Sequence, residues 1–467
     1  MRTRSLAGLA AAPAQQLPNI IIRLNDDQGW GDIDAAGHPV LQTPAADRLA
    51  LEGVRITDMT ANFPVCSPSR AGLLTGRDPH RFGPQHILNE GDKTNIPPFH
   101  QIPLEEPALA RVLKQAGYRT AHIGKWHVSL AHRRELGCAT PAGYGFDHEL
   151  ILGASHYDPS WTRNGERIQT LGRWSADLCV DEAIDFIEAS DGGEPFFINL
   201  WSFAPHGEVK CSDEHKARYA DRTPEEQICF GTITQQDEQY VRLLDYLDDN
   251  GLAESTVIFY SSDNGSDGHT IPWLVDSPGF TGPFSGSKHN IHEAGIRVPG
   301  IVRWPGVAPA GTVGTVPVSL LDVVPMFSAL VGVPTPEGLP LDGGDFRPAP
   351  TGQPVERAHA LYWQYGQSCS LIHMGEEFTS PQLAMRKGPW KLMGNFGWTF
   401  LELYNLDIDP GQRWNLAERH PEIAADMLEE MKLIHADING PYQKVAKILH
   451  PNVVSPAYKG NYVEVEK

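Results

Sequence analysis

The stretch NIIIRLNDDQGWGD (residues 19–32) joins a strand-like apolar run to a dense polar cluster. Its first part (19–24) is short and rich in β-branched residues, which is typical of a buried strand. The carboxylates Asp26 and Asp27 follow almost at once. In open α/β sheets, ligands bind beyond the carboxyl ends of the strands. The stretch therefore predicts a central strand that carries two adjacent carboxylates to a binding site.

Three further runs have the same construction. They are YRTAHIG (118–124), PFFINLWSF (195–203) and STVIFYSS (255–262), followed by KWH, APHGE and DNGSDGH. Helical patterns separate them: one opened by Thr43-Pro44 and ending before Gly53, and others at 104–117, 175–190 and 232–250. This alternation predicts an α/β fold with a large, mainly parallel mixed sheet sandwiched by helices. Any strand end can meet a polar loop, but four such clusters favour one shared site.

The bulk composition limits the classes of function. The chain has 467 residues, 38 Lys+Arg against 58 Asp+Glu, and a net charge of −20, which argues against nucleic acid as the main partner. No run approaches the roughly 18 apolar residues of a membrane span. Residues 1–17 have the shape of a signal peptide or a disordered tail. We expect export to the periplasm or the extracellular space, with a cytoplasmic location as the alternative.

The sequence changes character beyond residue 345. Short strand-like segments joined by turns (ALYWQY, QLAMRKGPWKLMG and LELYNL) precede a helical pattern at 421–438. We predict a catalytic α/β domain over 18–345. A smaller C-terminal α+β subdomain, with a short antiparallel sheet and a helix, is predicted over 346–467.

The polar clusters suggest particular chemistry. Asp26, Asp27, Asp263 and Asn264 form an all-oxygen donor set that suits Ca²⁺ or Mg²⁺ better than zinc, although DD and DNG are also ordinary turn sequences. Lys125 and His127 would point the same way on an extended segment. They offer a fixed charge and a proton-transfer group. His206 offers the same chemistry as His127, whereas a surface position is the default for Lys288.

The segment NFPVCSPSRAGLLTGR (62–77) contains Cys66, which could be a buried thiol, half of a disulfide, a metal ligand or a nucleophile. Ser67-Pro68 is typical of an N-cap followed by the first helical position, and the helix would end near Gly76. Cys66 would then lie at a helix N-terminus, with Arg70 about one turn further on. Such surroundings favour anions and are expected to acidify a thiol.

With these motifs in place, the chain resembles the type I sulfatases of the alkaline phosphatase superfamily over nearly its whole length. CSPSRAGLLTGR matches the family signature Cys-x-Pro-Ser-Arg followed by Leu-x-Gly-Arg. Further matches follow in family order: GYRTAHIGKWH (117–127), DNG (263–265), KHNIHEAGIRVP (288–299) and ELYNLDIDPGQRWNL (402–416). The loop 279–288 is similar to that of carbohydrate sulfatases acting on amino-sugar or galactose sulfates, such as N-acetylgalactosamine-6-sulfatase.

The resemblance implies that a separate maturase oxidises Cys66 to formylglycine. One hydroxyl of the aldehyde hydrate would attack sulfur, and the second would let the sulfated intermediate collapse. Ca²⁺, rather than Mg²⁺, is the implied metal. The implied ligands are Asp26, Asp27, Asp263, Asn264 and modified Cys66.

The resemblance also assigns roles to the charged and titratable side chains. Arg70 and Lys125 would hold the hydrate, and Lys125 and Lys288 the sulfate oxygens. His127 would act as the base for collapse, and His206 as the proton donor to the leaving oxygen. The residues expected to contact the rest of the substrate are His269, His289 and His292.

The expected partner is a sulfated glycan or small sulfate ester. Two alternatives remain: a phosphate monoester or phosphonate diester hydrolase of the same superfamily, and a glycan-binding pseudo-sulfatase. Asn264 also begins an Asn-Gly-Ser glycosylation sequon. A buried metal ligand cannot carry a glycan, so we predict that Asn264 is unmodified.

Overall fold

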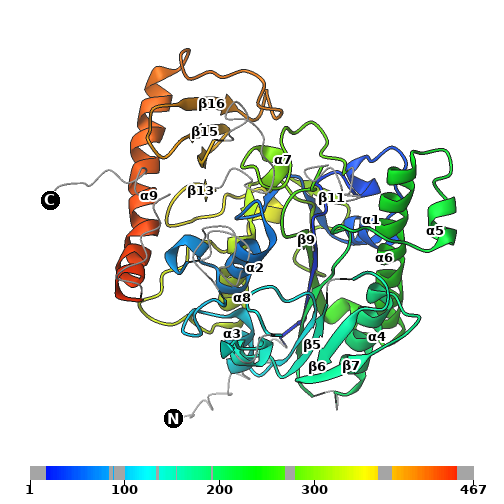
Figure 1. The fold of residues 1–467 in the computed structure, drawn as a ribbon. Helices are drawn as coiled ribbons and strands as arrows, with labels where there is room; N and C mark the ends of the chain where they lie inside the picture. Colours follow the sequence, from blue (N-terminus) through cyan, green and yellow to red (C-terminus); the bar gives the residue numbers. More distant parts are fainter. Residues whose placement is uncertain are drawn as a thin grey trace, which may run out of the picture.

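Within the described residues, ten strands form one sheet through the middle of the molecule (Figure 1). The computed structural model describes residues 17–83, 88, 100–132, 136–153, 155–190, 193–268, 279–365 and 381–449, so of the predicted signal or tail it covers only Leu17. In spatial order the strands are β11 (Thr312–Gly314), β2 (Val54–Ile56), β10 (Gly300–Arg303), β9 (Thr256–Ser262), β1 (Asn19–Asn25), β8 (Phe196–Trp201), β4 (Arg119–Gly124), β5 (His148–Leu152), β6 (Ser160–Arg163) and β7 (Glu166–Gln169).

Helices cover both faces of this sheet, as Figure 1 shows. One face carries α1 (Pro44–Glu52), α4 (Ser175–Glu188) and α6 (Pro224–Asp249). The other face carries α2 (Cys66–Thr75), α3 (Leu109–Gln115) and α8 (Val323–Val331). The predicted α/β sandwich is confirmed. No helix in the described ranges is both long and apolar enough to cross a membrane.

Strand β1 is buried along its whole length because it contributes to both cores. Ile20 and Ile22 pack into the core beneath α2, α3 and α8, whereas Ile21 packs into the core beneath α1, α4 and α6. This alternation follows from the two-residue period of a strand. Arg23 also points toward the second core, where its guanidinium pairs with Asp237 of α6 at 2.7 Å.

Strands β9, β1, β8 and β4 are adjacent and mutually parallel. They are the four strands predicted from the apolar runs, and each ends at a polar cluster. Since parallel neighbours end at the same edge of a sheet, the four clusters meet there. The convergence expected from the sequence is therefore confirmed.

Two predicted helices differ from the observed ones at their N-termini. The helix predicted at 104–117 begins only at Leu109, because the residue before it, Ala108, is extended (φ −127°, ψ 128°), and Pro107 disfavours helical backbone at Glu106. The helix predicted at 232–250 begins earlier, at Pro224. A capping box between Thr223 and Glu226 fixes that start and was readable in the sequence.

A smaller antiparallel sheet follows in the C-terminal part of the chain, as predicted. Its strands are β13 (Leu361–Gln364), β14 (Leu383–Lys387), β15 (Trp390–Gly394) and β16 (Leu401–Asn405). Helix α9 (Pro421–Leu449) packs on one face, and residues next to α2 and to the short helix α7 (Glu293–Ile296) pack on the other. The domain boundary at 345/346 stays a prediction. The described residues also form a two-stranded pair, β3 (Met59–Thr60) and β12 (Val318–Ser319), and helix α5 (Asp213–Ala217).

Asp342 is a buried junction between distant segments. Its carboxylate accepts hydrogen bonds from Arg81 Nη2 at 2.6 Å, His359 Nε2 at 2.9 Å and the Asp78 N–H at 2.6 Å. Arg81 also pairs with Asp437 of α9 at 2.5 Å. The junction therefore ties α9 to the large domain.

We predict that Asp342→Asn lowers the free energy of unfolding by about 3–5 kcal/mol at pH 7, because it removes the buried anionic partner of Arg81 and leaves only the exposed Asp437. Burial opposes ionisation of Asp342, but hydrogen bonds from His359 and Arg81 outweigh it and hold the pKa well below its usual range. This contribution is present above the unfolded-state pKa of about 3.9 and is lost as pH falls below it.

Urea unfolding at pH 7 and at pH 3 tests this prediction. The wild type is expected to lose stability toward acid more steeply than Asp342→Asn. Asp345→Asn, in a half-exposed pair with Arg347, is the control and should change stability by less than about 1 kcal/mol. Equal stability of Asp342→Asn and wild type at pH 7 would contradict the prediction.

Candidate functional site

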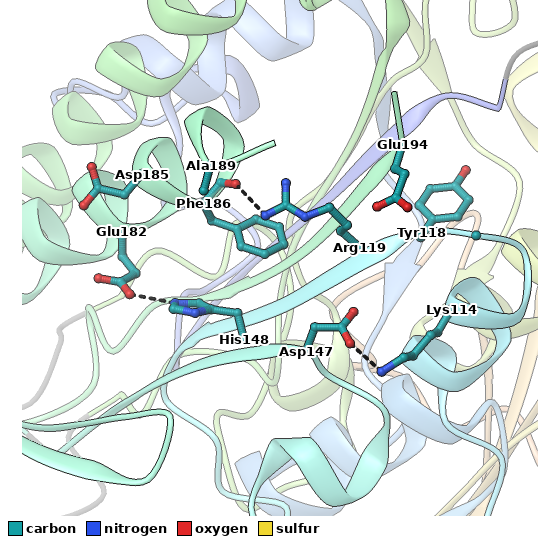
Figure 2. Close-up of a pocket in the computed structure, with 11 residues that line it drawn as sticks. Lys114, Tyr118, Arg119, Asp147, His148, Glu182, Asp185, Phe186, Ala189 and Glu194 are labelled. Atoms are coloured by element: carbon teal, nitrogen blue, oxygen red, sulfur yellow. Dashed lines mark hydrogen bonds and ion pairs between the residues drawn. The ribbon is translucent and has the colours of Figure 1, made fainter. Parts of the chain in front are cut away.

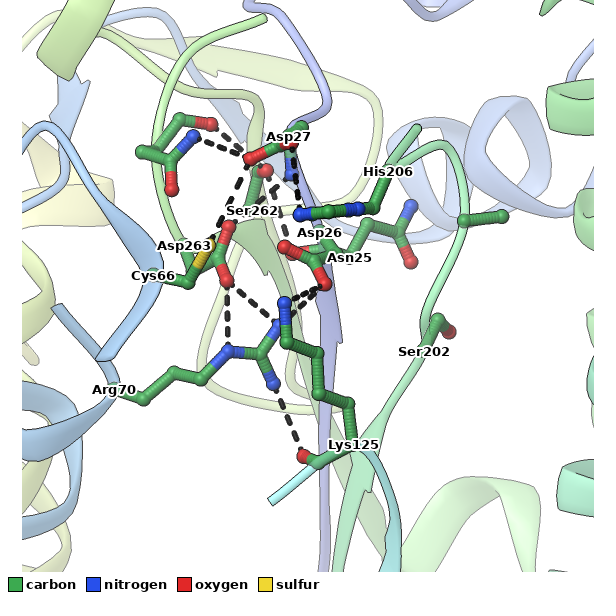
Figure 3. A network of polar contacts seen from close by, with 12 residues as sticks. Asn25, Asp26, Asp27, Cys66, Arg70, Lys125, Ser202, His206, Ser262 and Asp263 are labelled. Carbon is green, nitrogen blue, oxygen red and sulfur yellow. Dashed lines mark hydrogen bonds and ion pairs between the residues drawn. The ribbon is translucent and has the colours of Figure 1, made fainter. Parts of the chain in front are cut away.

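Side chains from four strand ends and one helix start meet at one edge of the large sheet (Figure 3). They are Asp26 and Asp27 after β1, Lys125 and His127 after β4, His206 after β8, Asp263 and Asn264 after β9, and Cys66 at the first position of α2. Arg70 projects from α2 one turn later, and Lys288 comes from the loop before α7. The structure thus brings together every residue predicted for the core of the site.

Each of three fully buried carboxylates pairs with a different cation. The pairs are Asp26 with Lys125, Asp27 with Lys288 at 2.6 Å, and Asp263 with Arg70 at 2.7 Å. Burial opposes ionisation of Asp26 and Asp27, but the surrounding cations outweigh it and lower both pKa values. Burial raises the pKa of Asp263 to about 7, against the opposing effect of Arg70. With all six groups charged, the formal charges cancel.

Two oxygens at the centre of this cluster lack hydrogen-bond partners within the described residues. They are Asp26 Oδ1 and Asn264 Oδ1, both buried. Buried polar atoms are nearly always satisfied, so an orphan pair of acceptors indicates a missing cation or donor. Ligand atoms of Asp26, Asp27, Cys66 and His206 also lie within 4.8 Å of one another. The donor set therefore fits a divalent cation.

Cys66 is the first residue of α2, and its side chain is only 2% exposed. The prediction that Ser67 caps this helix is wrong. Ser67 lies inside the first turn, where its Oγ accepts a hydrogen bond from the Leu88 N–H, and Pro68 is tolerated there because first-turn N–H groups need no helical partner. The Cys66 sulfur lies 3.9 Å from Asp27 Oδ1.

The prediction of an acidified thiol at Cys66 is also wrong. Burial raises the pKa of this thiol well above its usual range, and Asp26 adds to the shift. The cations Lys125 and Lys288 oppose the shift without reversing it. The unmodified thiol is consequently a poor nucleophile at neutral pH.

The two histidines of the cluster are neutral at neutral pH. Burial and nearby Lys125 lower the pKa values of both His127 and His206. His127 adopts left-handed backbone (φ 57°) rather than the extended conformation that we expected, and its buried Nδ1 has no hydrogen-bond partner among the described residues. His206 donates from Nδ1 to the Gly207 carbonyl at 2.6 Å, which leaves Nε2 facing Asp27 at 3.7 Å.

Sequence reasoning missed two residues beside the cluster. Asp267 lies 3.5 Å from Lys288 Nζ, and the DNGSD stretch that contains it could have suggested this position. His156 donates from Nε2 to the backbone carbonyl of His206 at 2.8 Å. His156 is a single histidine in a loop, and no local pattern indicates its contact.

The three predicted substrate-contacting histidines remain predictions. His269 lies outside the described residues. His289 is hydrogen-bonded to Tyr365, and the His292 ring donates to Asn290. Burial, with a further effect of Lys391, lowers the pKa of His292 to about 4.

A separate cavity of about 620 Å³ opens at the amino end of β4, at the opposite edge of the sheet (Figure 2). Arg119, the first residue of β4, lines it. His148 pairs with Glu182 there at 2.7 Å, and Lys114 pairs with Asp147. The lining also includes Asp185 and Glu194, so its carboxylates outnumber its cations, and no nucleophile or metal-type cluster lies among them. The chemistry is better placed at the carboxyl edge.

Asn264 is fully buried, and its Nδ2 donates to Asp27 Oδ1 and to the Gly265 carbonyl, each at 2.8 Å. We therefore predict no glycan at Asn264 when the protein is produced in a glycosylating host. Glu166→Ser is the matched control, because it places the same Asn-Gly-Ser triplet at exposed Asn164. Peptide mass spectrometry should find a glycan at Asn164 in that variant and none at Asn264, and a glycan at Asn264 of folded protein would contradict the buried role.

The chain is similar in sequence and structure to known sulfatases. Residues 18–333 match the family model described as Sulfatase, and residues 284–437 match N-sulphoglucosamine sulphohydrolase, C-terminal. The N-acetylgalactosamine-6-sulfatase of Sus scrofa is 30% identical over 510 residues, with 98% of this chain and 93% of the relative covered. That of Homo sapiens is 32% identical, covering 88% and 83%. The crystal structure of Ps i-CgsB in complex with k-i-k-neocarrahexaose has a TM-score of 0.79 at 25% identity, covering 94% and 98%.

Proposed function

The chain belongs to the sulfatase family, and from this premise we propose that it removes sulfate from a sulfated carbohydrate, using a formylglycine formed from Cys66 and a bound Ca²⁺ ion. The observation that carries the proposal is the buried cluster of three carboxylates and three cations around Cys66. Relatives named for an amino-sugar sulfate, and a solved neighbour that holds neocarrahexaose, support a carbohydrate substrate.

The proposed Ca²⁺ ligands are Asp26, Asp27, Asp263, Asn264 and modified Cys66. The orphan oxygens Asp26 Oδ1 and Asn264 Oδ1 support this set, because Ca²⁺ prefers carboxylate and amide oxygens. When bound, Ca²⁺ would polarise the sulfate oxygens and the nucleophile. Since the three carboxylates and three cations cancel when all six are ionised, the occupied site would be positive and would attract a sulfate ester anion.

Modification of Cys66 would solve the problem posed by its raised thiol pKa. A hydrated aldehyde carries two hydroxyls on one carbon, so one can attack sulfur and the other can later lose a proton. The motif Cys66-Ser67-Pro68-Ser69-Arg70 is the proposed recognition sequence for the maturase.

The cations have distinct proposed positions around the reacting group. Arg70 lies four residues after Cys66 on α2, and residues with this spacing share one helix face. The pKa values of Lys125 and Lys288 are raised although burial opposes the charged form, because the nearby anions, led by Asp26 and Asp27 respectively, together outweigh burial; both lysines stay charged. Arg70 and Lys125 would hold the hydrate, and Lys125 and Lys288 would donate to the sulfate oxygens as charge builds up on them.

The neutral histidines suit the proposed proton transfers. His127 would accept the proton of the second hydroxyl and so release sulfate. His206 would donate from Nε2 to the leaving sugar oxygen after the arriving sulfate anion raises its pKa. Fixed by its bond to the Gly207 carbonyl, the His206 ring already presents Nε2 to the cluster.

A substrate panel tests this function. Matured enzyme should release sulfate, measured by ion chromatography, from sulfated galactose, sulfated N-acetylgalactosamine or their oligosaccharides. Matched phosphate monoesters and phosphonate diesters should react more slowly. Faster turnover of the phosphorus esters would favour the hydrolase alternative, and glycan binding without turnover would favour the pseudo-sulfatase.

A further inference from the structure

The loop that carries Lys288 is attached first to the large domain. The Lys288 N–H donates to the Ser266 carbonyl at 2.9 Å, and the His289 N–H donates to the Pro64 carbonyl at 3.0 Å. The Lys288 ammonium reaches Asp27 at 2.6 Å. These bonds fix the start of the loop against the polar ends of the large sheet and the segment before α2.

The far end of the same loop is attached to the C-terminal sheet. Lys391 of β15 donates from Nζ to the Ile291 carbonyl at 2.8 Å and to Glu293 Oε1 at 2.7 Å. The Glu293 N–H donates to Gln412 Oε1 at 2.7 Å, beyond β16. The Glu293 carboxylate also pairs with Arg297. Two side chains of the C-terminal sheet region therefore hold the loop within five residues of Lys288.

The ion pair between Lys391 and Glu293 has a desolvation cost, which argues for a role beyond packing. Lys391 and Glu293 are both fully buried. Removing two charged groups from water is repaid only when the geometry is good, and a well-packed apolar pair is often as stable. A buried ion pair is thus a poor device for stability alone, but it fixes the direction of a loop.

We propose that Lys391 is a positioning residue for Lys288, so that the C-terminal sheet forms part of the catalytic unit. The inference rests on the proposed function, in which Lys288 binds the sulfate oxygens. Lys391 acts through the Ile291 carbonyl and the Glu293 carboxylate and contacts no reacting atom. Without it, the loop can shift and move the Lys288 ammonium away from the sulfate.

A double-mutant cycle tests this proposal in the full-length, matured enzyme. An activated aryl sulfate keeps slow variants measurable. Lys391→Met is expected to lower kcat/KM by about 10²-fold, the usual cost of a misplacement near 1 Å. In a Lys288→Ala background the same change should have almost no further effect, because residues that act through one another are not additive. Arg357→Met is the control, since Arg357 is a largely buried cation that ties the segment before β13 to Asp322 and Pro317.

The outcomes separate the possibilities. The positioning role would be overturned if Lys391→Met lowered kcat/KM by the same factor in the wild-type and Lys288→Ala backgrounds, or if it did not lower kcat/KM at all. If Lys391→Met does not fold, Gln412→Ala removes the second attachment and should show the same non-additivity with Lys288→Ala. Arg357→Met should leave kcat/KM within about threefold, and thermal unfolding of every variant identifies purely structural losses. A wild-type enzyme that is inactive on all sulfate esters would instead refute the proposed function itself.

Discussion

Cys66→Ala is expected to lower kcat for sulfate ester hydrolysis by about 10⁴-fold or more, the scale seen when a covalent nucleophile is removed. Alanine offers no carbon that can carry a pair of hydroxyls, so neither the attack on sulfur nor the collapse can occur. Released sulfate, measured with matured wild type and variant at equal concentration, checks the loss. The fold should survive, because the change removes one atom at the end of a short side chain.

Cys179→Ala is the matched control for this experiment. Cys179 is also buried, in α4, and burial raises the pKa of its thiol as it does for Cys66. It packs into the apolar core beneath α1, α4 and α6, which contains none of the site residues. Cys179→Ala should therefore keep wild-type kcat. Retention of a tenth or more of wild-type activity by Cys66→Ala would contradict the assignment of the nucleophile.

Removal of the proposed Ca²⁺ ion is expected to have the second large effect on activity. Chelation should lower kcat/KM by about 10²-fold or more, and added Ca²⁺ should restore it, because the metal would provide charge stabilisation worth several kcal/mol. Ca²⁺ at 100 times its Kd should also stabilise the fold by about 2.7 kcal/mol. Asp26→Asn should abolish both responses, since it removes the charge from an orphan ligand oxygen and leaves Lys125 unpaired.

Asp342→Asn serves as the control for Ca²⁺ binding, because it is a buried carboxylate in a different cluster. It should unfold at lower temperature than wild type yet keep the full shift caused by Ca²⁺. The purified protein should contain Ca²⁺ by elemental analysis. Zinc bound with an intact Cys66 thiol would contradict the account, since Cys66 sulfur, His206 nitrogen and two carboxylates are also acceptable zinc ligands.

The sequence predicted the parts of this site that depend on local pattern. Asp26, Lys125 and Asp263 each follow directly on an apolar strand, and the parallel order of those strands brings them together. The pattern of apolar residues along the chain was therefore sufficient to predict where the four strands end. The same pattern was sufficient to predict the small antiparallel sheet, because turn residues separate its strands in the sequence.

Properties that arise from distant segments were not predictable in this way. The predicted low pKa of the Cys66 thiol was wrong because burial by distant segments, with a smaller contribution from Asp26, outweighs the lowering by Lys125 and Lys288. The contact of His156 with the His206 carbonyl depends on where the loop after β5 lies. In the sequence, Lys391 is an ordinary strand lysine. Its contact with the loop that carries Lys288 depends on how β15 packs against that loop.

The dependence of activity on the state of residue 66 tests the central claim most directly. Preparations made with different amounts of maturase should contain different aldehyde fractions, quantified by mass spectrometry of the peptide that contains Cys66. The account predicts that the rate of sulfate release from a sulfated carbohydrate rises in proportion to that fraction and extrapolates to zero for the pure thiol. Full activity in a preparation that contains only the thiol would contradict it.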